Sequence, residues 1–283
     1  MKILRFGPKG QEKPGCIDKN GNIRDLSGVT DDFAGNAVSI EALKKIQGLK
    51  IDDLPIIGAD VRIGSCVAWV PNFYCIGLNY GRHADESNMA HPSEPIIFSK
   101  ASSALSAPND PVIIPKDALK ADWEVELGVV IGKHAEHVSQ EDALSFVAGY
   151  CVINDVSERA FQLEMGGQWI KGKSAPTYGP TGPYLVTADE VPDPQDLGLT
   201  LSLNGTTMQN SSTSDMIFSV AEIISYMSRF MALVPGDIIA TGTPEGVGMG
   251  QKPQRYLRDG DVMKLQVQGL GTQQQTAISF PPE

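Results

Sequence analysis

The first seventy residues combine short apolar runs with turn signals. Residues 2–6 (KILRF) alternate apolar and polar side chains as a strand does, and Asn20-Gly21 lies in a stretch typical of a β-hairpin. Residues 39–46 (SIEALKKI) carry the spacing of a short amphipathic helix. A new apolar run begins directly after Pro71. We therefore expect a small N-terminal α+β domain over residues 1–70 and a larger domain over residues 71–283.

The larger segment is a series of short apolar runs separated by glycine and proline. They predict strands over residues 73–78, 95–99, 111–115, 125–132, 149–155, 199–205, 237–242 and 261–269. The many strands predict an α+β fold that is β-rich and dominated by a closed or rolled sheet with peripheral helices.

Three segments between these runs predict helices. Ser139 and Ser219 are each followed three residues later by an acid, which is the capping-box pattern of a helix start. The second of these helices ends before Pro235. A third is expected over residues 155–165, ending at Gly166-Gly167.

Composition narrows the class of protein. The 283 residues include 23 Lys+Arg and 34 Asp+Glu, a net charge of −11, which argues against nucleic-acid or anionic-membrane partners. The 4 cysteines have no CxxC spacing and lie among apolar residues, so we expect them reduced and structural. The chain start lacks the apolar segment of a signal peptide, and no run approaches the ~18 apolar residues of a membrane helix. We expect a cytoplasmic protein.

Three carboxylates are candidates for a metal site. Glu124 and Glu126 fall on one face of a strand, because side chains alternate with a period of two. Asp155 ends another apolar run, where a strand delivers a side chain to a site. Three oxygen ligands without His or Cys favour Mg²⁺ or Mn²⁺. Two other interpretations remain open, a solvated acidic strand and, for Asp155, a helix N-cap.

His83 is the strongest candidate for a general base. Glu86 follows three residues later, which on one helical turn places its carboxylate beside the imidazole. A carboxylate in that place fixes the tautomer and raises the basicity of the ring, as deprotonation of water requires. A surface histidine with a casual salt bridge is the competing interpretation.

Other motifs carry weaker signals. His134 and His137 offer a zinc pair but lack further ligands, so we interpret them as solvated or structural. Residues 167–174 match GxxxxGK[ST], but a helical segment precedes them and no helix can follow, which argues against a P-loop. Residues 246–250 (GVGMG) likewise lack the helix of a dinucleotide fingerprint.

Two polar residues and one lysine lie near the candidate acids in sequence. Arg159 and Gln162 follow Asp155 by four and seven residues, which on a helix is one face. A guanidinium and an amide there are suited to an anionic substrate, although a plain amphipathic helix also explains them. Lys173 is an isolated cation near the acids.

These motifs together resemble the fumarylacetoacetate hydrolase superfamily. The motifs that carry the resemblance, in order along residues 71–283, are YCIGLNYGRHADE, SEPIIFSK, DWEVELGVVIG, GYCVINDVSER, KGKS and DIIATGTPEGVG. The segments FGPKGQEKPG and KPQRYLRDGDV further resemble a subgroup that includes 2,4-diketo-3-deoxy-L-rhamnonate hydrolases and acylpyruvase-like enzymes.

The resemblance implies roles for individual residues. It implies that Glu124, Glu126 and Asp155 bind the metal. It implies a catalytic dyad of His83 and Glu86 on a lid segment. The remaining implied positions are an enolate-assisting Lys173 and the substrate-binding residues Tyr80, Arg159, Gln162 and Thr243. Gly81-Arg82 departs from the Ala-Asp common before the histidine, which leaves specificity open. The implied fold is a rolled mixed β-sheet with a small N-terminal domain, usually a homodimer.

The expected function is hydrolysis of a carbon–carbon bond. The resemblance implies an Mg²⁺- or Mn²⁺-dependent enzyme that cleaves a 2,4-diketo acid, such as 2,4-diketo-3-deoxy-L-rhamnonate or a related sugar acid, to pyruvate and a carboxylic acid. An oxaloacetate-type decarboxylase, an isomerase and a ureidoglycolate lyase use related metal–enolate chemistry and stay open. A non-catalytic metal-binding module is the alternative from another class.

Overall fold

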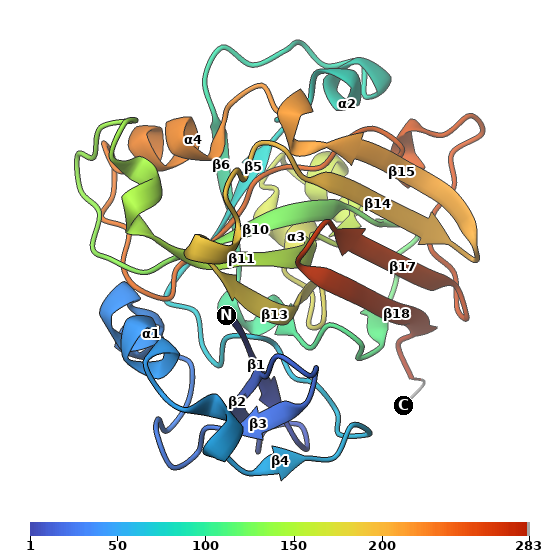
Figure 1. Cartoon of the computed structure of the whole chain (residues 1–283). Coiled ribbons are helices and arrows are strands. Elements are labelled where there is room, and N and C mark those ends of the chain that lie inside the picture. The colour runs from blue at the N-terminus through green and yellow to red at the C-terminus, as the bar shows by residue number, and fades with distance from the viewer. Residues whose placement is uncertain (282–283) are drawn as a thin grey trace.

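Two β-sheets pack against each other in the computed structural model, which describes residues 1–281 (Figure 1). In spatial order, the larger 11-stranded sheet contains β4 (Ile56–Ile57), β3 (Ile23–Asp25), β2 (Lys13–Ile17), β1 (Lys2–Phe6), β13 (Gly179–Thr187), β11 (Val147–Asn154), β10 (Val125–Ile131), β16 (Ile238–Ala240), β5 (Phe73–Gly77) and β6 (Ile96–Lys100), with β7 (Leu105–Ser106) paired to β13. The 5-stranded sheet contains β15 (Thr206–Ser212), β14 (Gly198–Leu203), β17 (Val262–Val267), β18 (Gly271–Ser279) and β8 (Val112–Ile114). A separate two-stranded pair joins β9 (Ala121–Asp122) to β12 (Ser157–Glu158).

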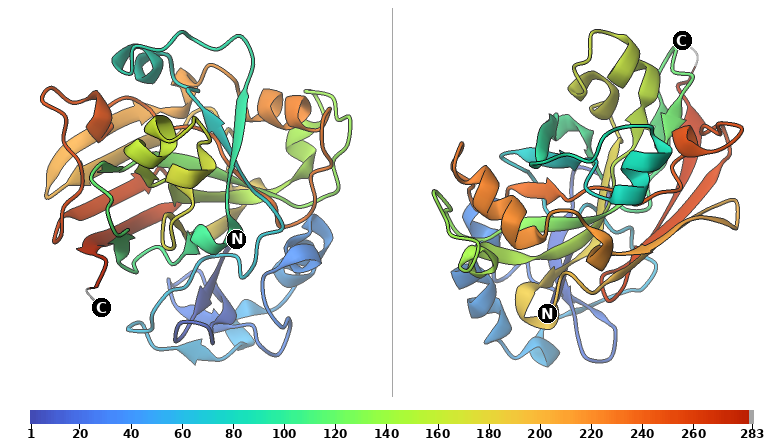
Figure 2. Two further views of the ribbon diagram at one scale, coloured as in Figure 1. Left: turned by 180° about the vertical axis from the view of Figure 1, so that it is seen from behind. Right: turned by 90° about the horizontal axis from the view of Figure 1, so that it is seen from above.

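Helices are short and lie around the sheets (Figure 2). The α-helices are α1 (Ile40–Gln47), α2 (Gly81–Glu86), α3 (Ile170–Lys173) and α4 (Val220–Met227), and η5 (Ala160–Glu164) is a π-helix. The 3₁₀ turns are η1 (Gly35–Val38), η2 (Ile51–Asp53), η3 (Ser102–Ala104), η4 (Ala143–Phe146), η6 (Ala188–Glu190), η7 (Thr213–Asp215) and η8 (Gly248–Gly250). Because β16 runs parallel to β5 while β10 and β11 are antiparallel, the sheet is mixed, and the predicted β-rich α+β class is confirmed.

The central strand β10 is buried along its whole length, since both faces of the large sheet are covered. Leu127 and Val129 pack toward the 5-stranded sheet with Leu201 of β14 and Leu265 of β17. Val130 belongs to a second apolar cluster on the other face. A strand covered on both sides reads as a continuous apolar run, which is why residues 125–132 stand out in the sequence.

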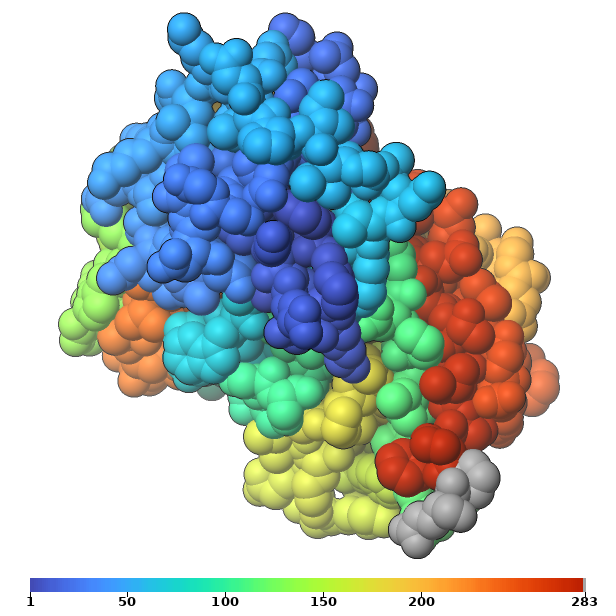
Figure 3. All heavy atoms as spheres, turned by 90° about the horizontal axis from the view of Figure 1, so that it is seen from below, coloured from blue at the N-terminus to red at the C-terminus, as the bar shows by residue number. Residues whose placement is uncertain are grey.

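The N-terminal segment continues the large sheet. Lys2 and Ile3 of β1 pair antiparallel with Val186 and Leu185 of β13. Ile3 shares its apolar cluster with residues of β5, β11 and β13, and the segment covers much of the face shown in Figure 3. The boundary near residue 70 stays a prediction, and one core extends across it.

Two helix predictions were wrong. Asp142 donates its backbone N–H to the Ser139 hydroxyl (3.1 Å), but only the 3₁₀ turn η4 follows, because β11 begins at Val147. The segment 155–165 first forms strand β12 and becomes helical only at η5. Asp155 is therefore not a helix N-cap. At Ser219 the capping box forms with Glu222 and opens α4 as predicted.

The cysteines and the helix lengths can be compared directly with the sequence predictions. All four cysteines are buried and free, as predicted: Cys16, Cys66, Cys75 and Cys151. Among residues 1–281, no helix has the length and apolar character needed to cross a bilayer.

Close strand packing at Gly149 gives a stability prediction. A Cβ at this position of β11 would lie 2.2 Å from the backbone oxygen of Val186 in β13, so Gly149→Ala must push two paired strands apart. We expect a loss of about 1–3 kcal/mol in unfolding free energy, measured by urea denaturation. Gly28→Ala is the control, because nothing lies within 4 Å of its added Cβ. Equal stability of the two variants would contradict the prediction.

Candidate functional site

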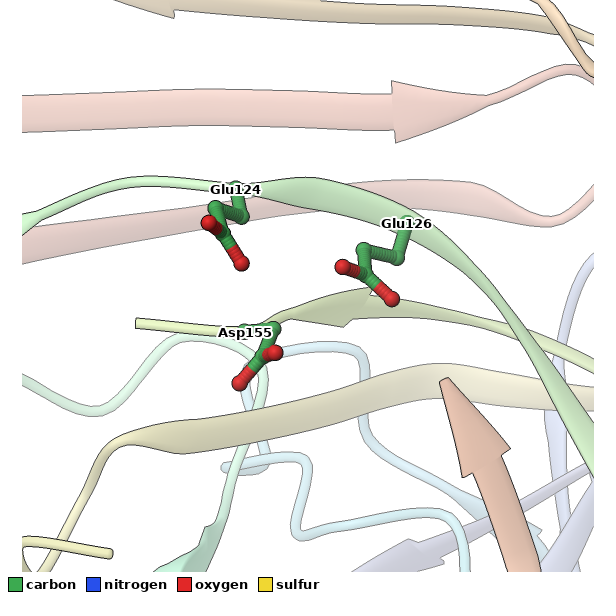
Figure 4. A group of neighbouring side chains, drawn as sticks. All are labelled: Glu124, Glu126 and Asp155. Atoms are coloured by element: carbon green, nitrogen blue, oxygen red, sulfur yellow. The ribbon is translucent and has the colours of Figure 1, made fainter. Parts of the chain in front are cut away.

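Three carboxylates converge at the ends of β10 and β11. Glu126 lies in β10, Glu124 directly precedes that strand, and Asp155 directly follows β11. The backbone N–H of Asp155 donates to the Glu124 carbonyl (2.9 Å), which fixes the two strand ends together. One oxygen from each of the three carboxylates lies within 4.8 Å of the others, and all three residues are buried. Figure 4 shows the side chains directed into a common space.

Two buried lysines neutralise part of this charge. Lys173, in α3, donates to Glu124 (2.6 Å) and to Asp155 (2.7 Å), so its ammonium bridges two of the acids. Lys100, at the end of β6, pairs with the other oxygen of Asp155 and donates to the Val156 carbonyl (3.1 Å). Burial lowers the pKa of Lys173, but Asp155 and Glu124 outweigh it and raise that pKa above its ordinary value.

Glu126 differs from the other two acids. Its carboxylate accepts the backbone N–H of Gly242 (2.8 Å), and no cationic side chain of residues 1–281 forms a salt bridge with it. Burial, followed by the charges of Asp155 and Glu124, raises the pKa of Glu126 well above its usual value. Burial also raises the pKa of Glu124, but Lys173 and Arg159 reverse this and lower it to about 2. A hard divalent cation among the three oxygens would remove the repulsion at Glu126, so the donor set fits Mg²⁺ or Mn²⁺.

Arg159 is held between three partners. Its Nε donates to Asp122 (2.8 Å), Nη2 lies 2.7 Å from a Glu124 oxygen, and Nη1 donates to the Gln162 amide oxygen (3.1 Å). Arg159 and Gln162 thus lie together as predicted, although the helical turn between them belongs to the π-helix η5 and does not begin at Asp155.

Asp122 connects this guanidinium to a glycine-rich loop. Its carboxylate is fully buried and accepts the backbone N–H groups of Gly248 (2.6 Å) and Met249 (3.0 Å). A Cβ on Gly248 would lie 1.9 Å from the Arg255 carbonyl oxygen, so the loop can approach this closely only without a side chain there.

His83 and Glu86 lie on the short helix α2. His83 Nδ1 is 2.9 Å from Glu86 Oε1, and the Glu86 carboxylate also accepts the backbone N–H of Gly246 (3.0 Å). An ionised carboxylate only accepts, so it assigns the proton to Nδ1 and leaves Nε2 with a free lone pair. Gly246 has φ +101°, and its added Cβ would lie 1.9 Å from the Met208 carbonyl oxygen, so this contact requires glycine.

A cleft joins these groups. Its polar lining residues are His83, Ser87, Glu124, Glu126, Arg159, Gln162, Lys173 and Thr243. Its other lining residues are Ile76, Gly77, Leu78, Met89, Phe98, Leu163, Trp169 and Met249. His83, Glu124 and Glu126 therefore face one space, in which a bound molecule can contact all three.

Of the predicted substrate-binding residues Tyr80 and Thr243, only Thr243 lines the cleft. Tyr80 is buried in the main apolar cluster and does not line the cleft, and its hydroxyl has no partner among the described residues. Burial, followed by the charge of Glu126, raises the pKa of Tyr80 well above its ordinary value. Thr243 lines the cleft, but its hydroxyl donates to the Val125 carbonyl (2.9 Å) and accepts from Gln209 (2.8 Å).

The motifs that the sequence argued against take no part in the site. His134 and His137 are exposed and belong to no metal-ligand cluster in the described part of the chain. Within residues 167–174 the helix α3 ends at Lys173, and β13 is the next element, so the arrangement of a P-loop is absent from this described segment.

Sequence reasoning missed Lys100 and Asp122. Lys100 ends an apolar run, as Asp155 does, and this position was a usable signal. Asp122 precedes the acid pair by two residues, and its role depends on a loop 126 residues away in the chain.

Comparisons with known proteins agree with this arrangement. The sequence profile described as Fumarylacetoacetate (FAA) hydrolase C-terminal matches residues 72–278. A Burkholderia multivorans protein, named provisionally as a hydrolase, is 53% identical over 276 residues, which cover 97% of this chain and 98% of that protein.

Two solved structures are similar along nearly the whole chain. Fumarylacetoacetate hydrolase from Exiguobacterium antarcticum has 34% identity and a TM-score of 0.85, over 99% of this chain and 100% of that one. Maleylpyruvate hydrolase from Sphingobium sp. SYK-6, in complex with manganese(II) and pyruvate, has 28% identity and a TM-score of 0.81, with the same coverage. This chain is therefore an enzyme of the fumarylacetoacetate hydrolase family.

Proposed function

We propose that this enzyme is a metal-dependent hydrolase that cleaves the C–C bond of a 2,4-diketo acid to give pyruvate and a carboxylic acid. The observation that carries the proposal is one cleft lined by the buried acids Glu124 and Glu126 and by His83, whose Nδ1 is fixed by Glu86. A related enzyme that binds manganese and pyruvate supports both the metal and the product.

Glu124, Glu126 and Asp155 are the proposed metal ligands. A divalent cation bound there supplies Lewis-acid polarisation of the oxygens of the 2-oxo acid. Lys173 forms salt bridges with Glu124 and Asp155, and Lys100 forms one with Asp155, so these contacts orient the two carboxylates. Arg159 and Gln162 line the same part of the cleft and are the proposed contacts for the substrate carboxylate.

His83 is the proposed general base. Its free Nε2 takes a proton from water, and the resulting hydroxide attacks the C4 carbonyl of the diketo acid. Glu86 stabilises the imidazolium that forms, because its carboxylate accepts the Nδ1 proton (2.9 Å).

Lys173 is the proposed stabiliser of the leaving group. When the C3–C4 bond breaks, the electron pair passes to an enolate of pyruvate, and the acyl carbon keeps the hydroxyl as a carboxylic acid. Lys173 lines the cleft, so its ammonium can stabilise the negative charge of the enolate. Return of the proton from His83 to the enolate carbon gives pyruvate, so one water is consumed for each turnover.

The proposal does not yet specify the acyl group that the substrate carries beyond the scissile bond. The sequence resemblance suggests 2,4-diketo-3-deoxy-L-rhamnonate or a related sugar acid, which makes this compound a necessary substrate in the assay. Oxaloacetate is the comparison substrate for decarboxylation, which does not require attack by water.

Removal of metal should abolish turnover. After treatment with EDTA and desalting, we expect pyruvate release from 2,4-dioxopentanoate to fall by roughly 100-fold or more, since Lewis-acid polarisation contributes several kcal/mol to the barrier. Added Mg²⁺ or Mn²⁺ should restore the rate. Full activity of a protein shown by elemental analysis to be metal-free would rule out the metal-dependent mechanism.

Loss of the base should lower kcat without loss of metal. His83→Ala is expected to reduce kcat by roughly 10²–10⁴-fold, the usual contribution of general base catalysis, with Mn²⁺ affinity unchanged by calorimetry. His91→Ala is the matched control, because His91 is exposed, pairs with Asp85 (2.9 Å) and is not among the residues that line the cleft. Unchanged kcat in His83→Ala would remove this residue from the mechanism.

A further inference from the structure

The cleft has two chemically distinct parts. The charged lining residues lie around the acids, whereas the remaining wall is formed by apolar side chains from five separate elements or loops. We call this wall the acyl wall and define it by Phe98, Trp169, Leu163, Met89 and Met249.

The acyl wall begins directly beside the centre of the site. The Lys173 Nζ lies 5.1 Å from the centroid of the Phe98 ring, and that ring contacts Trp169 edge-on with centroids 5.2 Å apart. Gly77 of β5 makes room for the indole, because a Cβ there would lie 2.6 Å from Trp169 Cζ3. The aromatic pair is therefore fixed between the enolate-stabilising lysine and the outer cleft.

The outer end of the wall consists of large apolar side chains that are open to solvent. Leu163 is 42% exposed and Met89 is 39% exposed, and each lines the cleft. They come from different segments, η5 and the loop after α2, so the cleft runs between them. Apolar groups gathered at the mouth of a polar site are typical of contacts with a ligand.

The cationic groups of the lining are already paired. Lys173 and Arg159 are the lining cations among residues 1–281, and both form salt bridges with Glu124. Arg82 on α2 pairs with Glu245 (3.2 Å) and is not a lining residue. The outer cleft thus offers no free cation, in the described residues, for a second carboxylate.

From this division we infer that the acyl group of the substrate is an uncharged, predominantly apolar chain that lies along the acyl wall. The inference rests on the proposed function and narrows its substrate class. Transfer of a carboxylate or several hydroxyls from water to this wall would leave them without partners, which enzymes discriminate against strongly. Each methylene that contacts the wall instead gains favourable transfer free energy.

Ser87 is the polar lining residue outside the charged centre. Its hydroxyl is buried and has no partner in the described structure. A single hydroxyl on the acyl group is therefore the polar substituent that competes most directly with the inference, and the deoxy sugar acid has this feature, since 2,4-diketo-3-deoxy-L-rhamnonate is 5-hydroxy-2,4-dioxohexanoate.

Matched substrates test the inference. The kcat/KM for 2,4-dioxoheptanoate is compared with that for 2,4-dioxoheptanedioate, which has the same chain length and a terminal carboxylate. The kcat/KM for 2,4-dioxohexanoate is compared with that for its 5-hydroxy derivative. We expect the apolar member of each pair to be favoured by about tenfold or more. Equal values in either pair, or preference for the polar member, would overturn the inference.

The reference substrate 2,4-dioxopentanoate separates the two levels of the proposal. Its acetyl group is too short to extend along the wall, so its cleavage tests the proposed hydrolase alone. If no diketo acid is cleaved by the metal-loaded enzyme, the proposed function fails. If the reference is cleaved but the apolar chains are not favoured, only the acyl-wall inference fails.

A charge placed on the wall should reverse the selectivity. Leu163→Arg puts a cation beside the outer cleft, so we expect the ratio of kcat/KM for 2,4-dioxoheptanoate over 2,4-dioxoheptanedioate to fall by about tenfold or more. Ile56→Arg is the matched control, because Ile56 is 60% exposed on β4 in the N-terminal segment. An unchanged ratio in a folded Leu163→Arg enzyme that cleaves the reference would contradict the assignment of this wall.

Discussion

The antiparallel pairing of β10 with β11 aligns Glu126 with Ile153 and brings Asp155 next to Glu124. Both strands are buried over their whole length, and the three acids at this register are buried as well, with little contact to water. The surroundings of the site follow from that constraint. Two lysines from distant elements neutralise two of the acids, and the third keeps a raised pKa that a divalent cation would remove.

The burial of these acids also connects the charged part of the cleft to its apolar wall. Arg159 compensates Glu124 but requires its own counter-charge, which Asp122 provides. Asp122 in turn holds the loop that carries Met249, a residue of the acyl wall. The geometry of the outer cleft therefore depends on electrostatic balance at its centre, so a change in one buried charge would disturb both parts.

The sequence could predict features that depend on local pattern. The spacing of Glu124 and Glu126, the strand end at Asp155 and the turn from His83 to Glu86 each follow from the period of one element. The capping boxes at Ser139 and Ser219 look alike in sequence. Their outcomes differ because only the second is followed by a helix that buries Ile223 and Met227 in the core.

Features that depend on partners distant in the chain could not be predicted from local sequence patterns. Strand β18 is rich in glutamine and is not among the predicted strands, yet Gln273 is fully buried and donates to the Val152 carbonyl (2.7 Å) of β11. The position of Lys100 at the end of an apolar run marks it as a candidate, but its partner Asp155 is evident only once β6 pairs with β5. The cationic partners of the acids are set by tertiary packing, for which a single sequence has no periodic signal.

The large sheet continues across residue 70, so residues on both sides of this position contribute to one sheet. The family profile begins at residue 72, but β13 pairs with β1, which lies seventy residues before that point. A chain begun there would leave this edge of β13 unpaired and uncover the apolar cluster that Ile3 and Phe33 complete. Unpaired strand edges beside apolar surface promote intermolecular association. The segment that matches the family profile therefore takes a strand partner and part of its apolar cluster from residues 1–71.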